Sequence, residues 1–380
     1  MLKRTVVIFM VLILTFLSGF QVFSLESDNL SAVSAVLYYP EYEKVLFEKN
    51  SDSLRSMAST TKIMTSLIAL EECTPDRVVE ITAEMVNVEG TSSGLRAGDK
   101  ITLRDLVYCM MLESGNDAAN SVAIELGGSF QGFAEIMNKR AAEIGMKNTS
   151  FVTPSGLDDE NHYTTAYDMA LLAAEALENR DFRGISKETN KKVTFVDSDK
   201  SVTLYNHNRL LREYDGCIGI KTGFTKKSGR CLVSAAERNG IMLIAVTLNA
   251  GDDWNDHKKM LDYGFSRVDS VTADNDFSHY SVRVVGGAEI NAYIESDDVS
   301  INFIKGEGSN ITRKIFLEKF LYSPVNKGDK IGFAEYYNGD RLIKTVPLTA
   351  KNSIEIKQKE KSENILDRLF SLFDSWWKNG

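Results

Sequence analysis

The chain contains few of the residues that build metal sites and disulfide frameworks. Its 380 residues include only four cysteines and four histidines. No two cysteines have C-x-x-C spacing and each lies in an apolar stretch, which favours buried thiols over disulfides. The histidines lack the close spacing of a zinc site, so we expect neither a metal nor a cofactor. The cysteines are Cys73, Cys109, Cys217 and Cys231.

The chain also lacks a surplus of positive charge. Its formal net charge is −9 and its pI is near 5.2, and no cluster of Lys and Arg is interleaved with aromatic residues. We therefore do not expect nucleic acid as a partner. With 43% apolar and 26% charged residues, the composition is that of a globular protein long enough for two domains.

The N-terminus has the composition of an export signal. A short basic segment precedes an apolar run of signal-peptide length, and residues tolerated at a cleavage site end at Ser24. We expect residues 1–24 to be a signal peptide and the mature protein to begin near Leu25. An uncleaved membrane anchor is the alternative, because apolar residues continue to Phe20. In both cases the rest of the chain is exported.

Residues 25–270 carry strand patterns at both ends and helical patterns between them. This order predicts an α+β domain in which an antiparallel sheet is closed from both termini and a helical subdomain lies beside it. The expected strands are 32–39, 44–49, 217–225, 230–236 and 241–248. The expected helices cover 103–112, a segment beginning near 117, 131–146, 165–180 and 253–264.

Two of these helices begin with a capping box, Thr102 to Asp105 and Thr165 to Asp168. The capping role accounts for an acidic residue at this position of a helix. We therefore interpret Asp168 as a structural residue rather than a catalytic one.

Residues 271–356 have a different sequence pattern from the preceding domain. Short alternating runs occur at 281–285, 288–294, 330–336 and 341–346, and the last two are joined by a turn at Asn338-Gly339. These runs predict a small all-β domain. It contains no catalytic constellation.

Residues 357–380 read as a charged linker and an amphipathic helix. Apolar residues recur at three- and four-residue intervals and include two of the three tryptophans of the chain. Because indole rings prefer the membrane interface, we expect this helix to anchor the protein peripherally to a membrane. Docking of the helix onto its own β domain or onto a partner is the alternative.

The chain is organised around residues 57–70. From Ile63 onward this segment is apolar on nearly every face, which predicts a buried helix. Its first turn carries Ser59 and Lys62 one above the other, a spacing that lets the amine reach the hydroxyl. Burial would lower the pKa of the lysine and make it a base, while the N–H groups at the helix start would suit an oxyanion. The alternative is that Ser59 is only a helix cap.

The S-x-x-K pattern alone is not specific, because Ser375 to Lys378 matches it equally well. Two further motifs follow in order, one in a predicted loop between helices and one on a strand beside a hairpin. They are Ser114-Gly115-Asn116 and Lys221-Thr222-Gly223. A decoy for the second motif, Ser27 to Asn29, precedes the nucleophile and lies next to the expected cleavage point, so we discard it.

Together the three motifs resemble the serine penicillin-recognising enzymes and, more fully, the D-alanyl-D-alanine carboxypeptidases. Residues 57–65, 114–119 and 219–223 look like the motif neighbourhoods of that family, and the β domain and tail look like its C-terminal portion. The resemblance implies a β-lactamase/transpeptidase-like catalytic domain that removes the terminal D-alanine from peptidoglycan pentapeptide stems. It also implies covalent inhibition by β-lactam antibiotics and a place on the outer face of the cytoplasmic membrane.

The resemblance also implies catalytic roles. Ser59 would attack the peptide carbonyl, Lys62 would take its proton, and Ser114 would relay protons toward the leaving amine. The backbone N–H groups of Ser59 and Phe224 would form the oxyanion hole. Some members of the family have histidine where this chain has Phe224, so a contribution from that imidazole is missing here.

The remaining motif residues would bind the substrate. Asn116 would hold Lys62 or the substrate backbone, and Lys221 and Thr222 would bind the terminal carboxylate. Gly223 would let the substrate lie along the strand without a side chain in the way.

Three other functions compete with this interpretation. A D,D-endopeptidase acting on cross-links uses the same site. A class A β-lactamase needs a deacylating glutamate in an E-x-x-L-N segment, and the nearest match, Glu175 to Asn179, has glutamate in place of leucine. A non-catalytic wall-binding module would have no chemical need for Ser59, Lys62 and Lys221 together.

Overall fold

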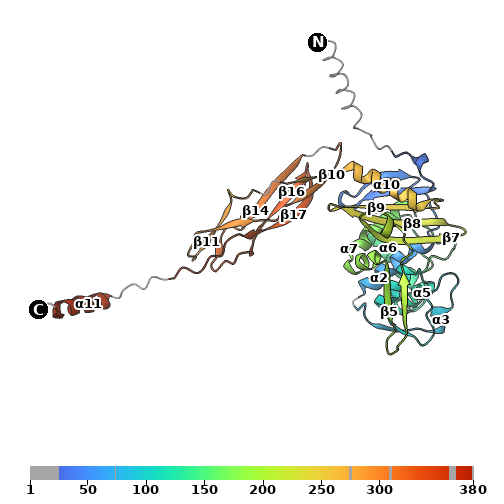
Figure 1. Ribbon diagram of the computed structural model, residues 1–380, viewed down its shortest axis with the longest axis horizontal. Coiled ribbons are helices and arrows are strands. Elements are labelled where there is room, and N and C mark those ends of the chain that lie inside the picture. Colours follow the sequence, from blue (N-terminus) through green and yellow to red (C-terminus); the bar gives the residue numbers. More distant parts are fainter. Residues whose placement is uncertain (1–24, 73, 274–275, 308–309, 359–364, 379–380) are drawn as a thin grey trace, which may run out of the picture. The chain divides into compact units, whose positions relative to one another are not determined.

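The computed structural model describes residues 25–72, 74–273, 276–307, 310–358 and 365–378 (Figure 1). They form two compact units, divided between Val268 and Asp269. The predicted signal peptide and Cys73 lie outside the described residues.

A five-stranded antiparallel sheet forms the frame of the first unit. Its strands are β1 (Ser34–Tyr39), β2 (Lys44–Lys49), β7 (Cys217–Thr225), β8 (Gly229–Arg238) and β9 (Ile241–Leu248). Their order is β2-β1-β9-β8-β7, so β1 pairs with β9 and strands from both ends of the unit share one sheet, as predicted. β7, which carries the third motif, lies at an edge of this sheet.

Helices cover both faces of the sheet. Every residue of β1 is buried, with α10 packed against one face and α7 against the other (Figure 1). The helices of this unit are α2 (Lys62–Glu71), α3 (Ala83–Val86), α4 (Leu103–Leu112), α5 (Asn116–Gly127), α6 (Phe130–Ile144), α7 (Ala166–Glu178), α8 (Arg180–Lys187), α9 (Leu210–Glu213) and α10 (Asp253–Arg267).

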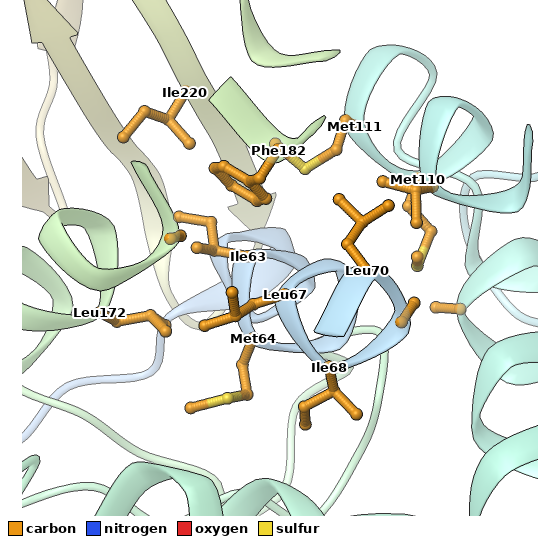
Figure 2. Close-up of a cluster of buried hydrophobic side chains, with 14 of the residues drawn as sticks. Ile63, Met64, Leu67, Ile68, Leu70, Met110, Met111, Leu172, Phe182 and Ile220 are labelled. Atoms are coloured by element: carbon orange, nitrogen blue, oxygen red, sulfur yellow. The ribbon is translucent and has the colours of Figure 1, made fainter. Parts of the chain in front are cut away.

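Helix α2 runs through the core of the first unit. All of its residues except Glu71 are buried. Figure 2 shows Ile63 and Leu67 of this helix among side chains from α4, α8 and β7, including Phe182 and Ile220. A helix that is apolar on nearly every face can bury all of its apolar faces only by lying inside the domain. The prediction of a buried helix is confirmed.

The sequence did not predict several short elements of the first unit. They are the hairpin of β5 (Asn190–Thr194) and β6 (Ser201–Tyr205), the pair β3 (Val78–Glu80) and β4 (Lys100–Thr102), and helix α8. In β5 and β6 only one residue of each strand is buried. Such strands carry too little apolar alternation to be recognised.

Asp168 has the structural role that the sequence suggested, but it is not one half of a reciprocal capping box. The Thr165 side chain accepts a hydrogen bond from the Asp168 N–H, as an N-cap should. The Asp168 carboxylate instead accepts from Asn148 N at 2.7 Å and Thr149 Oγ1 at 2.7 Å. It therefore fastens the preceding loop to helix α7.

The second unit is all-β up to Ile356, as predicted. Its strands are β10 (Val268–Thr272), β11 (Ser281–Val285), β12 (Asn291–Glu295), β13 (Ser300–Ile304), β14 (Ile311–Leu317), β15 (Leu321–Tyr322), β16 (Lys330–Asn338) and β17 (Arg341–Ala350). Six of them form a sheet in the order β14-β16-β17-β12-β11-β15, and β10 pairs with β13. Asn338 pairs with Arg341, so the hairpin turn is Gly339-Asp340, one residue later than predicted.

The C-terminal segment contains helix α11 (Ile365–Lys378), at the position of the predicted amphipathic helix. Its exposed apolar side chains include Leu369, Phe370, Leu372, Phe373 and Trp377. Among the described residues, no helix combines the length and apolar character needed to cross a bilayer.

Candidate active site

The first motif lies where a tight turn enters helix α2. Ala58 to Thr61 form a 3-10 turn, η3 (Ala58–Thr61), and the α-helix begins at Lys62. The prediction that Ser59 opens the α-helix is therefore wrong by three residues, and the N-cap of the α-helix is Thr61. Lys62 Nζ lies 2.9 Å from Ser59 Oγ, so the amine and the hydroxyl are paired as the spacing predicted.

Lys62 is enclosed by acceptors. Besides Ser59 Oγ, its Nζ contacts Asn116 Oδ1 at 2.7 Å and the carbonyl oxygen of Ser155 at 2.7 Å. The side chain is completely buried, and burial lowers the pKa of the amine well below its usual value. The charge of Lys221 lowers this pKa further, while Asp117 opposes the shift. The neutral amine needed for a base is thus favoured.

The second motif joins helices α4 and α5. Ser114 has a left-handed backbone with φ of 64°, and Gly115 is packed so closely that a Cβ atom would lie 2.0 Å from Ser93 Oγ. Asn116, the first residue of α5, donates from Nδ2 to the carbonyl oxygen of Glu89 at 2.6 Å. That bond turns Oδ1 toward Lys62, while Ser114 lines the cavity in front of Ser59.

A buried carboxylate next to this motif holds a second loop in place. Asp117 accepts hydrogen bonds from Ser92 Oγ at 2.6 Å, Ser93 N at 2.8 Å and Leu95 N at 3.1 Å. These bonds fasten residues 92–95 to the start of α5. The sequence analysis did not single out Asp117, although it directly follows the second motif.

The third motif lies on edge strand β7. Lys221 is 1% exposed, its Nζ contacts the carbonyl oxygen of Thr222 at 2.9 Å, and burial lowers its pKa to about 7. Phe224 is 66% exposed and lines the cavity. A Cβ atom at Gly223 would lie 3.0 Å from Ser59 N, so any side chain there would crowd the backbone of the proposed nucleophile.

The three motifs meet at one open cavity of about 460 Å³. Predicted residues that line it are Ser59, Ser114, Thr222, Gly223 and Phe224, whereas Lys62, Asn116 and Lys221 are buried behind its wall. A larger cavity in the second unit, about 660 Å³, has a mixed polar and apolar lining and brings no serine and lysine together. The chemistry therefore belongs to the first unit.

Two walls of the cavity were not predicted. On one, Arg230 Nη2 contacts the buried Asp253 at 2.7 Å, and the guanidinium lies 5.7 Å from the ring centroid of Trp254. On the other, Glu113 contacts His207 at 3.2 Å. These residues come from separate segments, and no short motif joins them.

His162 is a further residue that the sequence analysis missed. Its Nδ1 accepts from Val152 N at 2.9 Å, so Nε2 carries the proton and donates to Thr61 Oγ1 at 2.8 Å. Thr61 in turn donates to the carbonyl oxygen of Ala58 at 2.8 Å, directly before Ser59. Burial lowers the pKa of His162 to about 4, which keeps the imidazole neutral. The histidine thus braces the turn that presents Ser59.

The decoy motifs do not form comparable pairs. Lys378 Nζ contacts Asp374, and Ser375 Oγ donates to the carbonyl oxygen of Leu372, so the second S-x-x-K match contains no serine–lysine bond. Ser27 to Asn29 form a short 3-10 turn in which Asn29 Oδ1 accepts from Glu26 N.

The cysteines in the described part of the chain are free thiols, as expected. Cys109 and Cys231 are buried and Cys217 is half-buried. Burial raises the pKa of Cys217 and of Cys231 to about 11, so both are protonated at neutral pH.

Comparison with known proteins identifies the family of both units. The family model described as D-alanyl-D-alanine carboxypeptidase matches residues 21–252, and the model described as penicillin-binding protein 5, C-terminal domain, matches residues 265–356. The D-alanyl-D-alanine carboxypeptidase DacF of Bacillus subtilis is 32% identical over 339 residues, which cover 85% of this chain and 86% of that protein. The D-alanyl-D-alanine endopeptidase of Pseudomonas aeruginosa is 33% identical over 226 residues, covering 59% of this chain and 73% of that protein.

A solved structure shows the same architecture. The D-alanyl-D-alanine carboxypeptidase DacD from Francisella tularensis has 28% sequence identity and a TM-score of 0.61, over 86% of this chain and 94% of that one. Sequence and structure therefore agree over both units. The chain belongs to the D-alanyl-D-alanine carboxypeptidase family of serine peptidases, peptidase S11.

Proposed function

We propose that the protein is a serine-type D-Ala-D-Ala carboxypeptidase that removes the terminal D-alanine from pentapeptide stems of peptidoglycan. The observation that carries this proposal is the 2.9 Å contact between Ser59 Oγ and a completely buried lysine whose pKa is strongly lowered. Membership of the family supplies the substrate class.

In the proposed acylation step, Ser59 Oγ attacks the carbonyl carbon between the two D-alanines while neutral Lys62 takes the hydroxyl proton. The C–N bond then breaks. A proton passes from Lys62, with Ser114 as relay, to the amine of the leaving D-alanine. Water hydrolyses the Ser59 ester in the second half of the reaction and regenerates the hydroxyl. The developing oxyanion would be held by the N–H groups of Ser59 and Phe224.

Substrate binding would use the other motif residues. Lys221 and Thr222 would hold the terminal carboxylate, whose presence would also raise the pKa of Lys221 and keep it charged. Asn116 would keep Lys62 directed at Ser59, which its 2.7 Å contact supports. Gly223 has no side chain beside Ser59 N, and this would let the peptide lie along β7. β-Lactam antibiotics would acylate the same serine.

The proposed location follows from the two ends of the chain. Residues 1–24 would export the protein, and α11 would hold it peripherally on the outer face of the cytoplasmic membrane. The proposed organisation is a catalytic domain of residues 25–270, a β domain of residues 271–356 and an anchoring segment of residues 357–380. The exposed apolar side chains of α11 support the anchor.

The second candidate function is D,D-endopeptidase activity on cross-linked stems, because one relative carries that name. A β-lactamase has less support. Glu175, the nearest match to a deacylating glutamate, lies on α7 and is paired with Arg140 at 2.5 Å.

Mass spectrometry of the protein incubated with a diacyl tripeptide ending in D-Ala-D-Ala tests the proposal. We expect free D-alanine, and a slowly decaying penicillin adduct on the peptide that contains Ser59. Faster release from a cross-linked dimeric stem would make endopeptidase the main activity. Rapid penicillin turnover without D-alanine release would indicate a β-lactamase, and the absence of any adduct would indicate a binding module.

A further inference from the structure

Exposed apolar side chains gather where the chain leaves the β unit. Val285 of β11 and Tyr322 of β15 are direct partners in a parallel strand pair, and the Phe320 ring lies 5.4 Å from the Tyr322 ring. Ile356 forms a bridge with Gly287, two residues beyond Val285. The backbone of Ile290 lies beside β11, because Val284 N donates to its carbonyl oxygen, and the Ile290 side chain is exposed. We call these five the exit patch: Val285, Ile290, Phe320, Tyr322 and Ile356.

The apolar side chains of the exit patch are largely exposed. Tyr322 is 70% exposed, Ile290 68% and Ile356 59%. Single exposed apolar residues need no explanation, but a contiguous group of them marks an interaction surface. No residue of the catalytic cavity belongs to this group.

The position of the exit patch restricts what can cover it. Within the β unit, β10, where the chain enters, lies at one end, and β11 lies toward the other (Figure 1). The chain leaves beside β11, since Lys357 N donates to the carbonyl oxygen of Gly286 at 2.8 Å. Eight residues, 357–364, then lead to α11. A fully extended chain of that length spans at most about 28 Å.

We propose that the exit patch is a second membrane-contact surface, which inserts into the same lipid headgroup layer as α11. The inference rests on the membrane anchor put forward under the proposed function. When α11 lies in the headgroup layer, the short tether keeps Ile356, the patch residue where the tether begins, within about 28 Å of it. Phenylalanine, tyrosine and isoleucine side chains exposed at that distance gain free energy by entering the apolar boundary.

Charge does not supply the attraction. Lys319 and Lys357 flank the exit patch, but the exposed carboxylates of Glu318 and Glu355 lie one and two positions before them in the chain. The local charges therefore cancel. The contact is expected to depend on apolar insertion and to change little with salt, unlike binding by a polybasic segment. With α11 and the exit patch both in contact with lipid, the end of the β unit at which the chain leaves would face the bilayer.

Vesicle binding by the full mature chain, residues 25–380, tests the proposal. We expect the double variant Phe320→Glu/Tyr322→Glu to bind vesicles of phosphatidylethanolamine and phosphatidylglycerol roughly tenfold or more weakly than the parent. The matched control, Val271→Glu/Leu342→Glu, adds the same charge at exposed apolar positions of the β unit outside the exit patch. It should change binding less than threefold, a bound of the order expected for surface charges. Both variants should keep D-alanine release from soluble peptide, which shows that they are folded.

Hydrogen exchange on the same full chain locates the contact. We expect vesicles to protect peptides covering 283–287 and 319–323, together with α11. Protection of α11 alone, with equal binding by parent and double variant, overturns the exit patch and leaves the anchor standing. No binding by any form overturns both membrane proposals. Protection of 319–323 without vesicles, lost when α11 is deleted, would mean that α11 itself covers the exit patch and would also overturn the proposal.

Discussion

The two units of the molecule place polar and apolar residues in opposite ways. Among the residues that the structure describes, Asn302 is the one buried asparagine of the β unit and that unit buries no charged side chain, whereas the catalytic unit buries two lysines, two histidines and several aspartates. The β unit instead exposes large apolar side chains such as Ile290, Phe320 and Tyr322. Buried polar groups are costly unless they are paired. The catalytic unit bears part of this cost around Ser59, where buried Lys62 contacts its hydroxyl, whereas the β unit exposes apolar surface.

The two units should also differ in how they respond to substitutions. In the catalytic unit a single substitution should have a large effect, because Lys62 has specific partners in Ser59, Asn116 and Ser155. In the β unit and α11, function would depend on summed apolar area, so single changes should have graded effects.

The variant Ser59→Ala should lower the rate of D-alanine release by about 10⁴-fold or more, because no other hydroxyl contacts Lys62 Nζ in the described structure. Covalent penicillin labelling should disappear. The matched control is Ser375→Ala, which removes the serine of the second S-x-x-K match and should leave both readouts unchanged. Labelling that persists in Ser59→Ala would rule out this serine as the nucleophile.

His162 should make the catalytic unit less stable in acid. Its pKa is lowered from 6.5 to about 4, so between these pH values the unfolded chain binds more protons than the folded chain. Stability attributable to His162 is therefore present above pH 6.5 and is lost as the pH falls toward 4, by roughly 3 kcal/mol at most.

Urea unfolding of parent and His162→Gln between pH 4 and 7 measures this loss. The variant should show a flatter pH dependence in that window. The slope will not vanish, because the pKa of buried His257 is also lowered, to about 3. Identical slopes for parent and variant would show that His162 does not titrate in this way.

The anchor helix should respond to charge on one face only. The variant Phe370→Glu/Phe373→Glu should bind vesicles about 100-fold more weakly than the parent, since two aromatic rings would no longer enter the interface. The control Ser371→Glu/Ser375→Glu places the same charge on the other face and should have a much smaller effect. Activity on soluble peptide should be unchanged in both. Equal loss in the two variants would indicate a general charge effect rather than an inserted face.

Lys221 should set an upper pH limit for catalysis. In the free enzyme its pKa is lowered to about 7 by burial, and only the charged form can pair with the substrate carboxylate. The value of kcat/KM should therefore fall by up to about tenfold per pH unit above pH 7. In Lys221→Arg the side chain stays charged, so kcat/KM should not decline above pH 7. The maximum of kcat/KM will be lower than in the parent because the guanidinium is larger. A decline that persists in Lys221→Arg would have to come from another group.

Much of this architecture could be predicted because the patterns are local. The apolar run from Ile63 to Leu70 required a buried helix, and the three motifs appeared in order in the expected loop and strand settings. Local patterns failed where elements were short or polar. Strand β15 has only two residues, and β5 and β6 each bury a single side chain. None of these three strands therefore gives a periodic signal.

The pairing of Ser59 with Lys62 could be read from the sequence, because both residues lie within one segment at a spacing that brings their side chains together. Only the tertiary structure decided what surrounds them. Asn116 is 54 positions from Lys62 in the chain and Ser155 is 93 positions away, yet both contact its Nζ at 2.7 Å. The same is true of the His162 brace. Periodicity and motif spacing describe a segment, whereas distances between segments depend on how sheet and helices pack, and no local pattern encodes that packing.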